Sequence, residues 1–413
     1  MSDSQIRKVY LDSAATSFPK PPEVLEALTS YLEIAGNPGR GSHSYAMSGA
    51  RLIMEARQEI ARFLGIQEDE RLIFTPGCTA SINFVIKGYL NSRNLSHDSS
   101  GVKDGGIIVT SGLEHNSVMR PLSQLGRDSA FEFRSLGAGK EGVDVLEQLE
   151  SLLQSSSSVA LCAITAASNV TGEVLPFKEA ATLCRKYGVA CLVDGAQVAG
   201  KLPLDLSSTD ISFFCASGHK GLMGPPGVGL LYIAPGFDLN PLIAGGTGSG
   251  SESFNIPIAY PDRLEAGTAP GHDIWALSRG VDWIVRQNPE KLLAKELGLL
   301  QGFLNWASKQ PGVRIYGTSG DVENRDQTEN AVRMPVVSFD LEGCSPNEVA
   351  YKLDAEHGIA LRSGLHCAAQ AHESLGTLDT GLCRLSFGPG NSEADLESLT
   401  EALEEILSGM PCS

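Results

Sequence analysis

The sequence predicts an α/β protein in which helices cover a mainly parallel β-sheet. Short apolar runs typical of buried strands alternate along the chain with longer segments of helical periodicity. With 413 residues, 42% of them hydrophobic, the chain is long enough to bury a sizeable core and to form two or more domains. No apolar run approaches the roughly 18 residues that span a bilayer.

The expected elements follow the chain in order. Helical periodicity covers residues 22–34, 45–64, 143–153 and 178–187, and apolar strands are expected at residues 72–74, 107–110, 159–165, 189–193 and 211–216. Long helices over 271–309, interrupted at Asn288 and Pro289, lead into a smaller unit with a strand at 336–341 and helices at 346–357 and 393–407. We therefore expect a large domain over residues 15–275 and a small α+β domain formed by residues 1–14 and 276–413.

Charge, chain start and cysteine content narrow the function classes. The net charge of -17 argues against nonspecific binding of nucleic acid or of an anionic membrane, since both require a positive surface. The first eight residues lack the apolar segment of a secretory signal, which predicts a cytoplasmic protein. The nine cysteines are expected to be reduced thiols, and none shows the paired spacing of a metal site.

Lys220 is the first candidate for chemistry. It follows the strand expected at 211–216 and precedes a glycine-rich bend that ends at Gly227. A lysine held partly desolvated at a strand end can form a Schiff base with an aldehyde such as pyridoxal phosphate. The alternative is a surface lysine in a glycine turn.

Asp194 supplies the second candidate, at the end of the strand expected at 189–193. A carboxylate there can pair with a protonated pyridine nitrogen, and Gln197 can donate to the phenolic oxygen of the same ring. Taken alone, Asp194 is equally an ordinary helix cap. In parallel sheets ligands lie at the carboxyl ends of strands, where Asp194 and Lys220 both fall.

Four separated segments carry a resemblance to a known family: residues 11–16, 194–197, 217–220 and 362–368. In this order they resemble the class V, fold-type I pyridoxal-phosphate enzymes, and among them the cysteine desulfurases and selenocysteine lyases. The resemblance implies a seven-stranded, mainly parallel sheet in the large domain, pyridoxal 5'-phosphate as cofactor, and a homodimer. It also implies a role in sulfur metabolism such as iron–sulfur cluster assembly.

A phosphate anchor is expected where residues 74–81 form a strand end, a glycine turn and a polar helix start. Cys78 and Thr79 lie there, although Thr79 alone is also a simple N-cap. Ser217 is a further phosphate candidate, and the resemblance adds His219. It also implies that Thr268 reaches the phosphate of the neighbouring subunit.

Two more residues receive roles from the resemblance. His115 would stack on the pyridine ring and shuttle protons, a task that a near-neutral imidazole permits. Asn169 would contact the cofactor or the substrate. Locally, His115 is equally a structural histidine, and Asn169 equally a turn residue.

Cys367 would decide the reaction class. Arg362 and His366 lie close to it in sequence and can favour its thiolate. A thiolate can attack the sulfur of bound L-cysteine, so that a persulfide forms on Cys367 and L-alanine leaves. The other eight cysteines are expected to be inert and buried.

Two arginines complete the predicted site residues. The resemblance makes Arg384 and Arg362 substrate-binding residues, with Arg384 binding the α-carboxylate. A salt-bridging core arginine is the alternative for Arg384.

The sequence departs from the family pattern at Leu365, where the nearest group carries a histidine, and over residues 369–382, which include His372. The glycine-rich loop at 245–251 has no derived role.

Three hypotheses for the function stay open. The first is a cysteine desulfurase, acting also on selenocysteine or cystine, that passes sulfur to an acceptor protein. The second is a pyridoxal-phosphate C–S lyase or aminotransferase that does not need Cys367. The third is a noncatalytic protein that holds cofactor or sulfur. Nicotinamide binding is not expected, because neither glycine-rich segment, 221–229 or 245–250, opens a helix directly after a strand with an acidic residue about 20 positions on.

Overall fold

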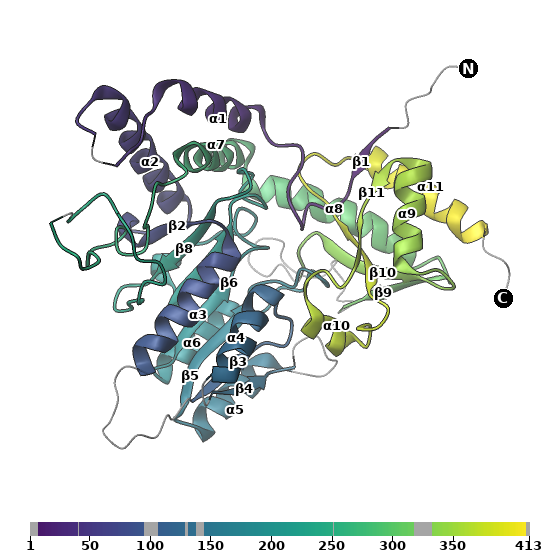
Figure 1. The fold of residues 1–413 in the computed structure, drawn as a ribbon. Coiled ribbons are helices and arrows are strands. Elements are labelled where there is room, and N and C mark those ends of the chain that lie inside the picture. Colours follow the sequence, from purple (N-terminus) through teal and green to yellow (C-terminus); the bar gives the residue numbers. More distant parts are fainter. Residues whose placement is uncertain are drawn as a thin grey trace.

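A seven-stranded sheet forms the centre of the larger part of the molecule (Figure 1). The computed structural model describes residues 7–39, 41–94, 106–128, 131–137, 144–250, 252–317 and 333–409. In spatial order the strands are β2 (Leu72–Thr75), β8 (Gly229–Ile233), β7 (Phe213–Ser217), β6 (Ala190–Asp194), β5 (Val159–Thr165), β3 (Ile107–Thr110) and β4 (Glu132–Ser135). Only β8 runs against its neighbours, β2 and β7. The prediction of a mainly parallel seven-stranded sheet is confirmed.

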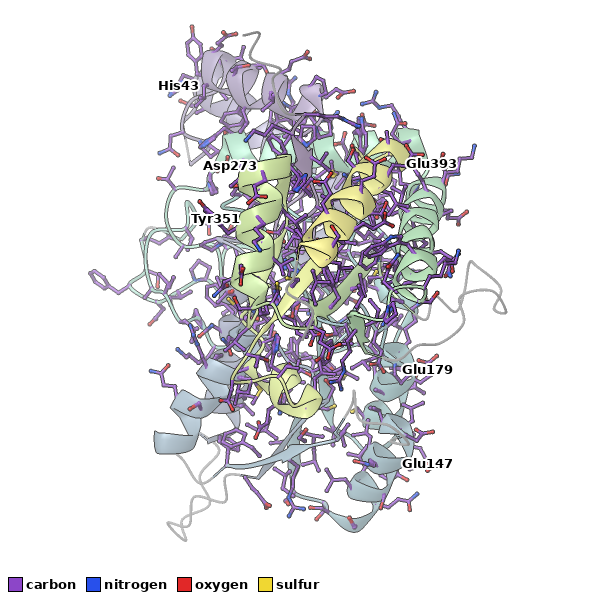
Figure 2. The ribbon with its side chains drawn as sticks, turned by 90° about the vertical axis from the view of Figure 1, so that its right-hand side faces the viewer. His43, Glu147, Glu179, Asp273, Tyr351 and Glu393 are labelled. Carbon is purple, nitrogen blue, oxygen red and sulfur yellow. The ribbon has the colours of Figure 1, made fainter. Side chains whose placement is uncertain are left out.

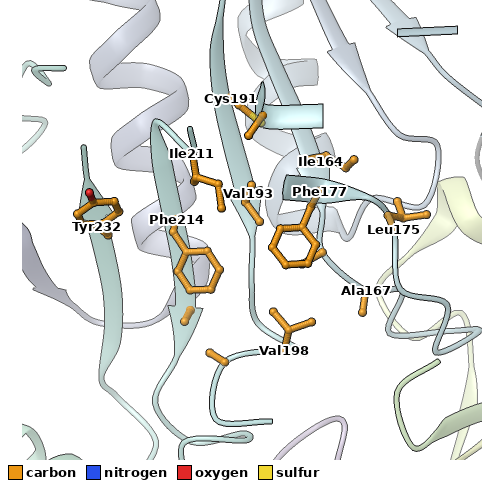
Figure 3. Close-up of a cluster of buried hydrophobic side chains, with 14 of the residues drawn as sticks. Ile164, Ala167, Leu175, Phe177, Cys191, Val193, Val198, Ile211, Phe214 and Tyr232 are labelled. Atoms are coloured by element: carbon orange, nitrogen blue, oxygen red, sulfur yellow. The ribbon is translucent and has the colours of Figure 1, made fainter. Parts of the chain in front are cut away.

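Helices cover both faces of this sheet because its central strands are buried on both sides. One face packs against α3 (Cys78–Asn94) and α4 (Asn116–Asp128), through side chains such as Ile82 and Val118. The other face packs against α2 (Ser44–Phe63), α5 (Val145–Ser155), α6 (Phe177–Lys186) and α7 (Gly271–Gln287). Figure 3 shows part of this second core, where Val193, Phe214 and Phe177 gather over the strands. Helix α1 (Pro22–Ile34) packs on the outside of α7 (Figure 1).

The smaller unit is built on a second, antiparallel sheet. Its strands are β12 (Arg362–Gly364), β13 (Leu382–Ser386), β10 (Val336–Leu341) and β9 (Val313–Tyr316), in that order. Helices α8 (Pro289–Ala307), α9 (Pro346–His357) and α11 (Glu393–Ser408) supply apolar side chains to its core. Near the start of the chain, β1 (Val9–Tyr10) pairs in parallel with β11 (Ile359–Ala360). This pairing agrees with assigning the first residues to the small domain, and the division of the chain at residues 275 and 276 stays a prediction.

The predicted elements differ from the observed ones mainly at their ends, by one or two residues. Residue 143, predicted to begin a helix, and residue 251 of the glycine-rich loop lie outside the described residues. The elements that were not predicted include the helix α4 and the strands β1, β4, β8, β9, β11 and β13. Of these, β4 is exposed along its whole length, so its sequence carries no apolar alternation. Three short helices complete the described elements: η1 (Asp69–Arg71), η2 (Leu206–Ser208) and α10 (Ala369–Leu375). Within the described ranges, the helices are too short or too polar to cross a membrane.

Candidate active site

A cavity of about 210 Å³ lies at the carboxyl ends of the central strands. Thr165, Asp194 and Ser217, the last residues of β5, β6 and β7, all contribute to its wall. The sequence-predicted residues that line it are Cys78, Thr79, His115, Asn169, Asp194, Gln197, Ser217, His219, Lys220, Arg362 and Arg384. Cys367 and Thr268 are not part of the lining. Parallel strands therefore bring most of the predicted residues to one place.

A larger hollow of about 690 Å³ lies between α5 and α6, and half of its lining residues are carboxylates. Glu147 and Glu179 belong to it and project outward on the same side of the molecule (Figure 2). None of the predicted site residues lines this hollow. We therefore assign the chemistry to the smaller cavity.

Lys220 lies in the tight turn that follows β7. The backbone N–H of Met223 donates to the Lys220 carbonyl at 2.9 Å, which closes the turn. Gly221 is required here, because a Cβ atom would lie 2.4 Å from the Ala199 carbonyl oxygen. Burial lowers the pKa of Lys220, while nearby Asp194 opposes this shift. The turn thus holds an amine that loses its proton more readily than an exposed lysine does.

Asp194 faces the same cavity and is held by three donors. Its Oδ1 accepts from the Ala196 N–H at 3.0 Å and from the Cys78 thiol at 3.5 Å, and its Oδ2 accepts from the Ser117 hydroxyl at 3.5 Å. The side chain is thereby fixed with its carboxylate beside the start of α3. Such a carboxylate is placed to pair with a cationic ring nitrogen.

His115 is neutral, which corrects the expectation of a near-neutral pKa. Burial, opposed by Asp194 and reinforced by Lys220, lowers its pKa to about 4. Its Nδ1 accepts from the Ser117 N–H at 3.0 Å, so the proton of the neutral ring sits on Nε2. The ring therefore offers a flat neutral surface and one N–H donor, and it does not readily accept a proton near neutral pH.

The opposite end of the cavity suits an anion. Thr79 lies in the first turn of α3, where helix N–H groups have no partner within the helix. Ser217 and His219 flank it, and His219 Nδ1 is buried without a hydrogen-bond partner among the described residues. Burial, together with Lys220 and Lys20, lowers the pKa of His219 to about 4, so the ring is neutral. An unpartnered buried nitrogen beside a helix start fits a bound phosphate group.

Thr268 lies outside this cavity, on an exposed loop. The loop is anchored at Glu265, which forms a bidentate ion pair with Arg57, with N···O distances of 3.0 and 2.8 Å. Glu265 also accepts from the Phe74 N–H at 2.7 Å. Thr268 is therefore an exposed residue close to a fixed point of the chain and does not line the cavity.

Arg384 lies under the cavity and is almost completely buried. Its Nη1 donates to the Asn169 carbonyl at 3.1 Å, its Nη2 pairs with Asp12, and its Nε has no partner among the described residues. Arg362 is its register partner on the neighbouring strand β12. The two guanidinium groups make this wall of the cavity suited to a carboxylate.

Cys367 lies beside the cavity on the loop between β12 and α10. Its thiol is exposed, and Arg362 Nη2 lies 3.6 Å from its sulfur. His366 and Cys367 both adopt left-handed backbone conformations, with φ of +51° and +56°. The Asn169 side chain donates to the His366 carbonyl at 2.8 Å, and the Asn116 N–H donates to the Cys367 carbonyl at 2.7 Å. These bonds offset the strain of the loop.

Only one of the two neighbours expected to favour the thiolate lies against the sulfur with its charged group. Arg362 supplies a positive charge beside the sulfur, but the His366 ring is buried and bonds to His372, with 3.2 Å between Nδ1 and Nε2. Burial first, and then Arg384 and His372, lower the pKa of His366 to about 2, against a raising effect of the Arg362 carbonyl. The expectation for His366 is therefore wrong, because a neutral imidazole gives no electrostatic support to a thiolate.

Sequence reasoning missed three features of the large sheet and its surroundings. Ser117 links His115 to Asp194, and buried Glu114 accepts from the Thr165 N–H at 3.1 Å, with its pKa raised to about 7 by burial. Three buried cysteines from β5, α6 and β6, namely Cys162, Cys184 and Cys191, place their sulfur atoms within 4.8 Å of one another. Ser117 and Glu114 carry a sequence signal, since both stand within two residues of His115. The cysteine cluster depends on contacts between distant segments.

Residues 9–399 match the sequence model of the family described as Aminotransferase class-V. Because this match spans nearly the whole chain, the chain belongs to the class V aminotransferase family. Within the family it belongs to the cysteine desulfurase branch, as its relatives indicate. The chain is 32% identical over 407 residues to a probable cysteine desulfurase of Halalkalibacterium halodurans, covering 96% of this chain and 92% of the relative. It is 30% identical over 404 residues to a probable cysteine desulfurase of Methanothermobacter thermautotrophicus, covering 96% and 94%.

A solved structure agrees with this placement. The apo structure of a cysteine desulfurase from Thermococcus onnurineus superposes with a TM-score of 0.86 at 28% identity, and the match covers 99% of this chain and 100% of that one. The fold and the family expected from the sequence motifs are thus confirmed, and the protein is an enzyme of this family.

Proposed function

We propose that this protein is a pyridoxal 5'-phosphate-dependent cysteine desulfurase, which converts L-cysteine to L-alanine and leaves a persulfide on Cys367. The observation that carries the proposal is the convergence of two sites. A half-buried lysine and a buried carboxylate face one cavity, and an exposed cysteine thiol lies beside it, next to Arg362. A protein that only held the cofactor would not need the second of these sites.

The residues present fit pyridoxal phosphate. The start of α3 with Thr79, Ser217 and His219 would hold the phosphate, because neutral His219 carries a buried nitrogen without a partner. Asp194 would pair with the ring nitrogen, and the flat neutral ring of His115 suits stacking. When bound, pyridoxal phosphate supplies an electron sink for the substrate carbon atoms. Lys220 is the residue that would hold its aldehyde carbon.

The protein side chains would then carry the substrate and the proton. Arg384 and Arg362 would bind the α-carboxylate of L-cysteine and orient its Cα–H bond. Lys220 would take the proton from Cα and later return it, a role that its burial-lowered pKa favours because the amine must be free to accept.

Cys367 would perform the sulfur transfer. Its thiolate attacks the sulfur of L-cysteine, an S–S bond forms as the C–S bond breaks, and the electron pair of that bond remains with the carbon skeleton. The carbon skeleton takes up a proton and leaves as L-alanine. One sulfur atom thus moves to Cys367 without any external oxidant or reductant. The exposure of the thiol supports onward transfer of sulfur to an acceptor protein, or to a route such as iron–sulfur cluster assembly.

Further parts of the proposal concern assembly and context. Thr268 is exposed, lies outside the cavity of its own chain and sits on a loop anchored by Arg57, which supports a homodimer in which Thr268 reaches the phosphate of the partner. All eight described cysteines are free thiols, in keeping with the reducing cytoplasm. Selenocysteine and cystine are further candidate substrates, because the sulfur or selenium atom would occupy the same position beside Cys367.

The test is the release of alanine and sulfide from L-cysteine in the presence of a thiol reductant, for the native chain, Cys367→Ser and Cys344→Ser at equal cofactor occupancy. Cys344 is a matched control, since it is half-buried and outside the site. We expect only Cys367→Ser to abolish alanine release. If Cys367→Ser stays as active as the native chain and pyruvate is the carbon product, the C–S lyase alternative replaces this proposal. If the native chain binds the cofactor and no amino acid changes its absorbance, the noncatalytic alternative replaces it.

A further inference from the structure

Three cysteines come together in the core of the large sheet, outside the active-site cavity. Cys162 lies in β5, Cys191 in β6 and Cys184 in α6, and all three side chains are fully buried. Their sulfur atoms lie within 4.8 Å of one another. None of the three lines the cavity that holds Lys220 and Asp194. The proposed function therefore leaves this three-cysteine cluster without a role.

Sheet register and one helix bring the cluster together. Cys162 and Cys191 are register partners on neighbouring parallel strands, so their side chains leave the same face of the sheet side by side. Helix α6 covers that face, and Cys184 belongs to the same apolar core. Figure 3 shows Cys191 among the apolar side chains of this face, which include Val193 and Phe177. The cluster thus lies in a dry part of the protein.

The spacing of the sulfur atoms suits a metal ion bound by three thiolates. An ion in the plane of three sulfur atoms, with metal–sulfur distances of about 2.3 Å, holds those atoms about 4.0 Å apart. The observed limit of 4.8 Å allows this triangle with only small movements of the side chains. No separate cavity is needed, because the ion lies between the sulfur atoms.

The surroundings of the cluster favour a cation. Hydrogen bonds from the Cys162 and Cys191 thiols lower the pKa of Cys184, against the opposing effect of burial. Cys184 also lies in the last turn of α6, where the helix dipole is negative. Buried Glu114 adds negative charge near Cys191. A bound cation would balance this charge, which the apolar core does not solvate.

Three sulfur ligands in a dry site restrict the kind of metal. Thiolates select soft ions such as Cu⁺, as well as Zn²⁺ and iron–sulfur clusters. Structural Zn²⁺ sites use four ligands, and iron–sulfur clusters use four cysteines. Within the described part of the chain, the cluster has no fourth histidine, cysteine or carboxylate, and its side chains are removed from solvent. Monovalent copper is the soft ion that three sulfur ligands satisfy.

We propose that the three-cysteine cluster is a binding site for one Cu⁺ ion, held by the sulfur atoms of Cys162, Cys184 and Cys191. Binding replaces the thiol protons, which pass to solvent, and the oxidation states of copper and sulfur do not change. The site does not depend on the proposed desulfurase function, because it lies outside the active-site cavity.

The test measures Cu⁺ binding by holoenzyme from which other thiols have been removed. The background protein carries Cys344→Ala, Cys367→Ala and Cys412→Ala, since Cys344 is half-buried, Cys367 is exposed and Cys412 lies outside the described residues. It is incubated without oxygen with Cu⁺ held by bicinchoninate, a chelator whose coloured complex reports the copper that the protein removes. Cys184→Ala then removes one proposed ligand. Cys215→Ala is the matched control, because Cys215 is fully buried on neighbouring β7 and outside the cluster.

The background protein should take up one Cu⁺ per chain, and slowly, because α6 has to move aside to admit the ion. Cys184→Ala should weaken Cu⁺ binding by more than about 100-fold, since losing even an outer partner of a metal ligand costs about 10- to 100-fold in affinity. Cys215→Ala should bind Cu⁺ as the background protein does. X-ray absorption at the copper edge should show three sulfur ligands at about 2.3 Å and no nitrogen or oxygen ligand. This spectrum needs no ligand variant, so the proposal stays testable if Cys184→Ala does not fold.

Four results would overturn the inference. The first is no copper uptake by the background protein, and the second is equal uptake by Cys184→Ala and Cys215→Ala. The third is an absorption spectrum with fewer than three sulfur ligands or with a nitrogen or oxygen ligand. The fourth is tighter binding of Zn²⁺ than of Cu⁺ by the background protein, which would contradict a three-ligand site for a monovalent ion.

Discussion

The buried ion pair between Lys201 and Glu296 gives a stability prediction that bears on the active site. The pair joins the segment after β6 to helix α8, with side chains 16% and 2% exposed. Lys201 follows Gly200, whose backbone packs against the turn that carries Lys220. Replacing Lys201 by Met leaves the Glu296 carboxylate buried without its partner. Removing one member of a buried pair costs about 3–5 kcal/mol of unfolding free energy.

The loss should depend on pH in a defined direction. Burial already raises the pKa of Glu296, and Lys201 is the main group that lowers it, so removing Lys201 raises that pKa further. A carboxyl whose pKa is higher in the folded than in the unfolded state destabilises the fold as the pH rises through the folded value. The deficit of Lys201→Met should therefore be larger at pH 8 than at pH 5, where Glu296 takes up a proton.

Equilibrium urea unfolding at both pH values measures this deficit. The double variant Lys201→Met/Glu296→Leu should recover most of the lost stability, because it removes the uncompensated charge. Lys352→Met is the matched control, since Lys352 pairs with Glu348 on the exposed surface of α9, and little change is expected there. The reasoning is refuted if Lys201→Met costs no more than the control, or if its deficit grows as the pH falls.

Three further outcomes are expected. Gly221→Ala should destabilise the lysine turn and weaken cofactor retention, because its Cβ atom would lie 2.4 Å from the Ala199 carbonyl oxygen. Gly298→Ala is the control: this residue lies in helix α8 with open space around it, so the substitution should stabilise the protein by about 0.5–1 kcal/mol. Thermal melts of both variants with bound cofactor measure the two effects. Asp194→Asn should reduce kcat by roughly 10- to 100-fold, the equivalent of losing a charged hydrogen bond in the transition state, and an unchanged kcat would contradict its role as partner of the ring nitrogen. The pH profile of kcat/KM should show no step from His115 between about pH 6 and 8, because its pKa lies at about 4; a step there that disappears in His115→Gln would contradict a neutral ring.

Local sequence pattern determined the secondary structure and much of the cavity. Residues 159–165 form β5 with the predicted bounds, because a strand buried on both faces of the sheet is a continuous apolar run in the sequence. Asp194 and Lys220 face one cavity, because parallel strands end at a common edge of the sheet. Both signals are local. They can be read without knowing which strands are neighbours.

Tertiary structure decided what depends on neighbours in space. The position of His366 beside Cys367 in sequence suggests a cation near the thiol. In the structure the loop has a left-handed backbone conformation, and the imidazole is buried and hydrogen-bonded to His372. Likewise, the sequence near His115 carries no sign of the desolvation that keeps its ring neutral. The orientation of these two histidine rings, their desolvation and their hydrogen-bond partners depend on residues from segments that are far apart in the chain. The sequence and its family resemblance therefore identified the chemical groups, and only packing determined their protonation states and partners.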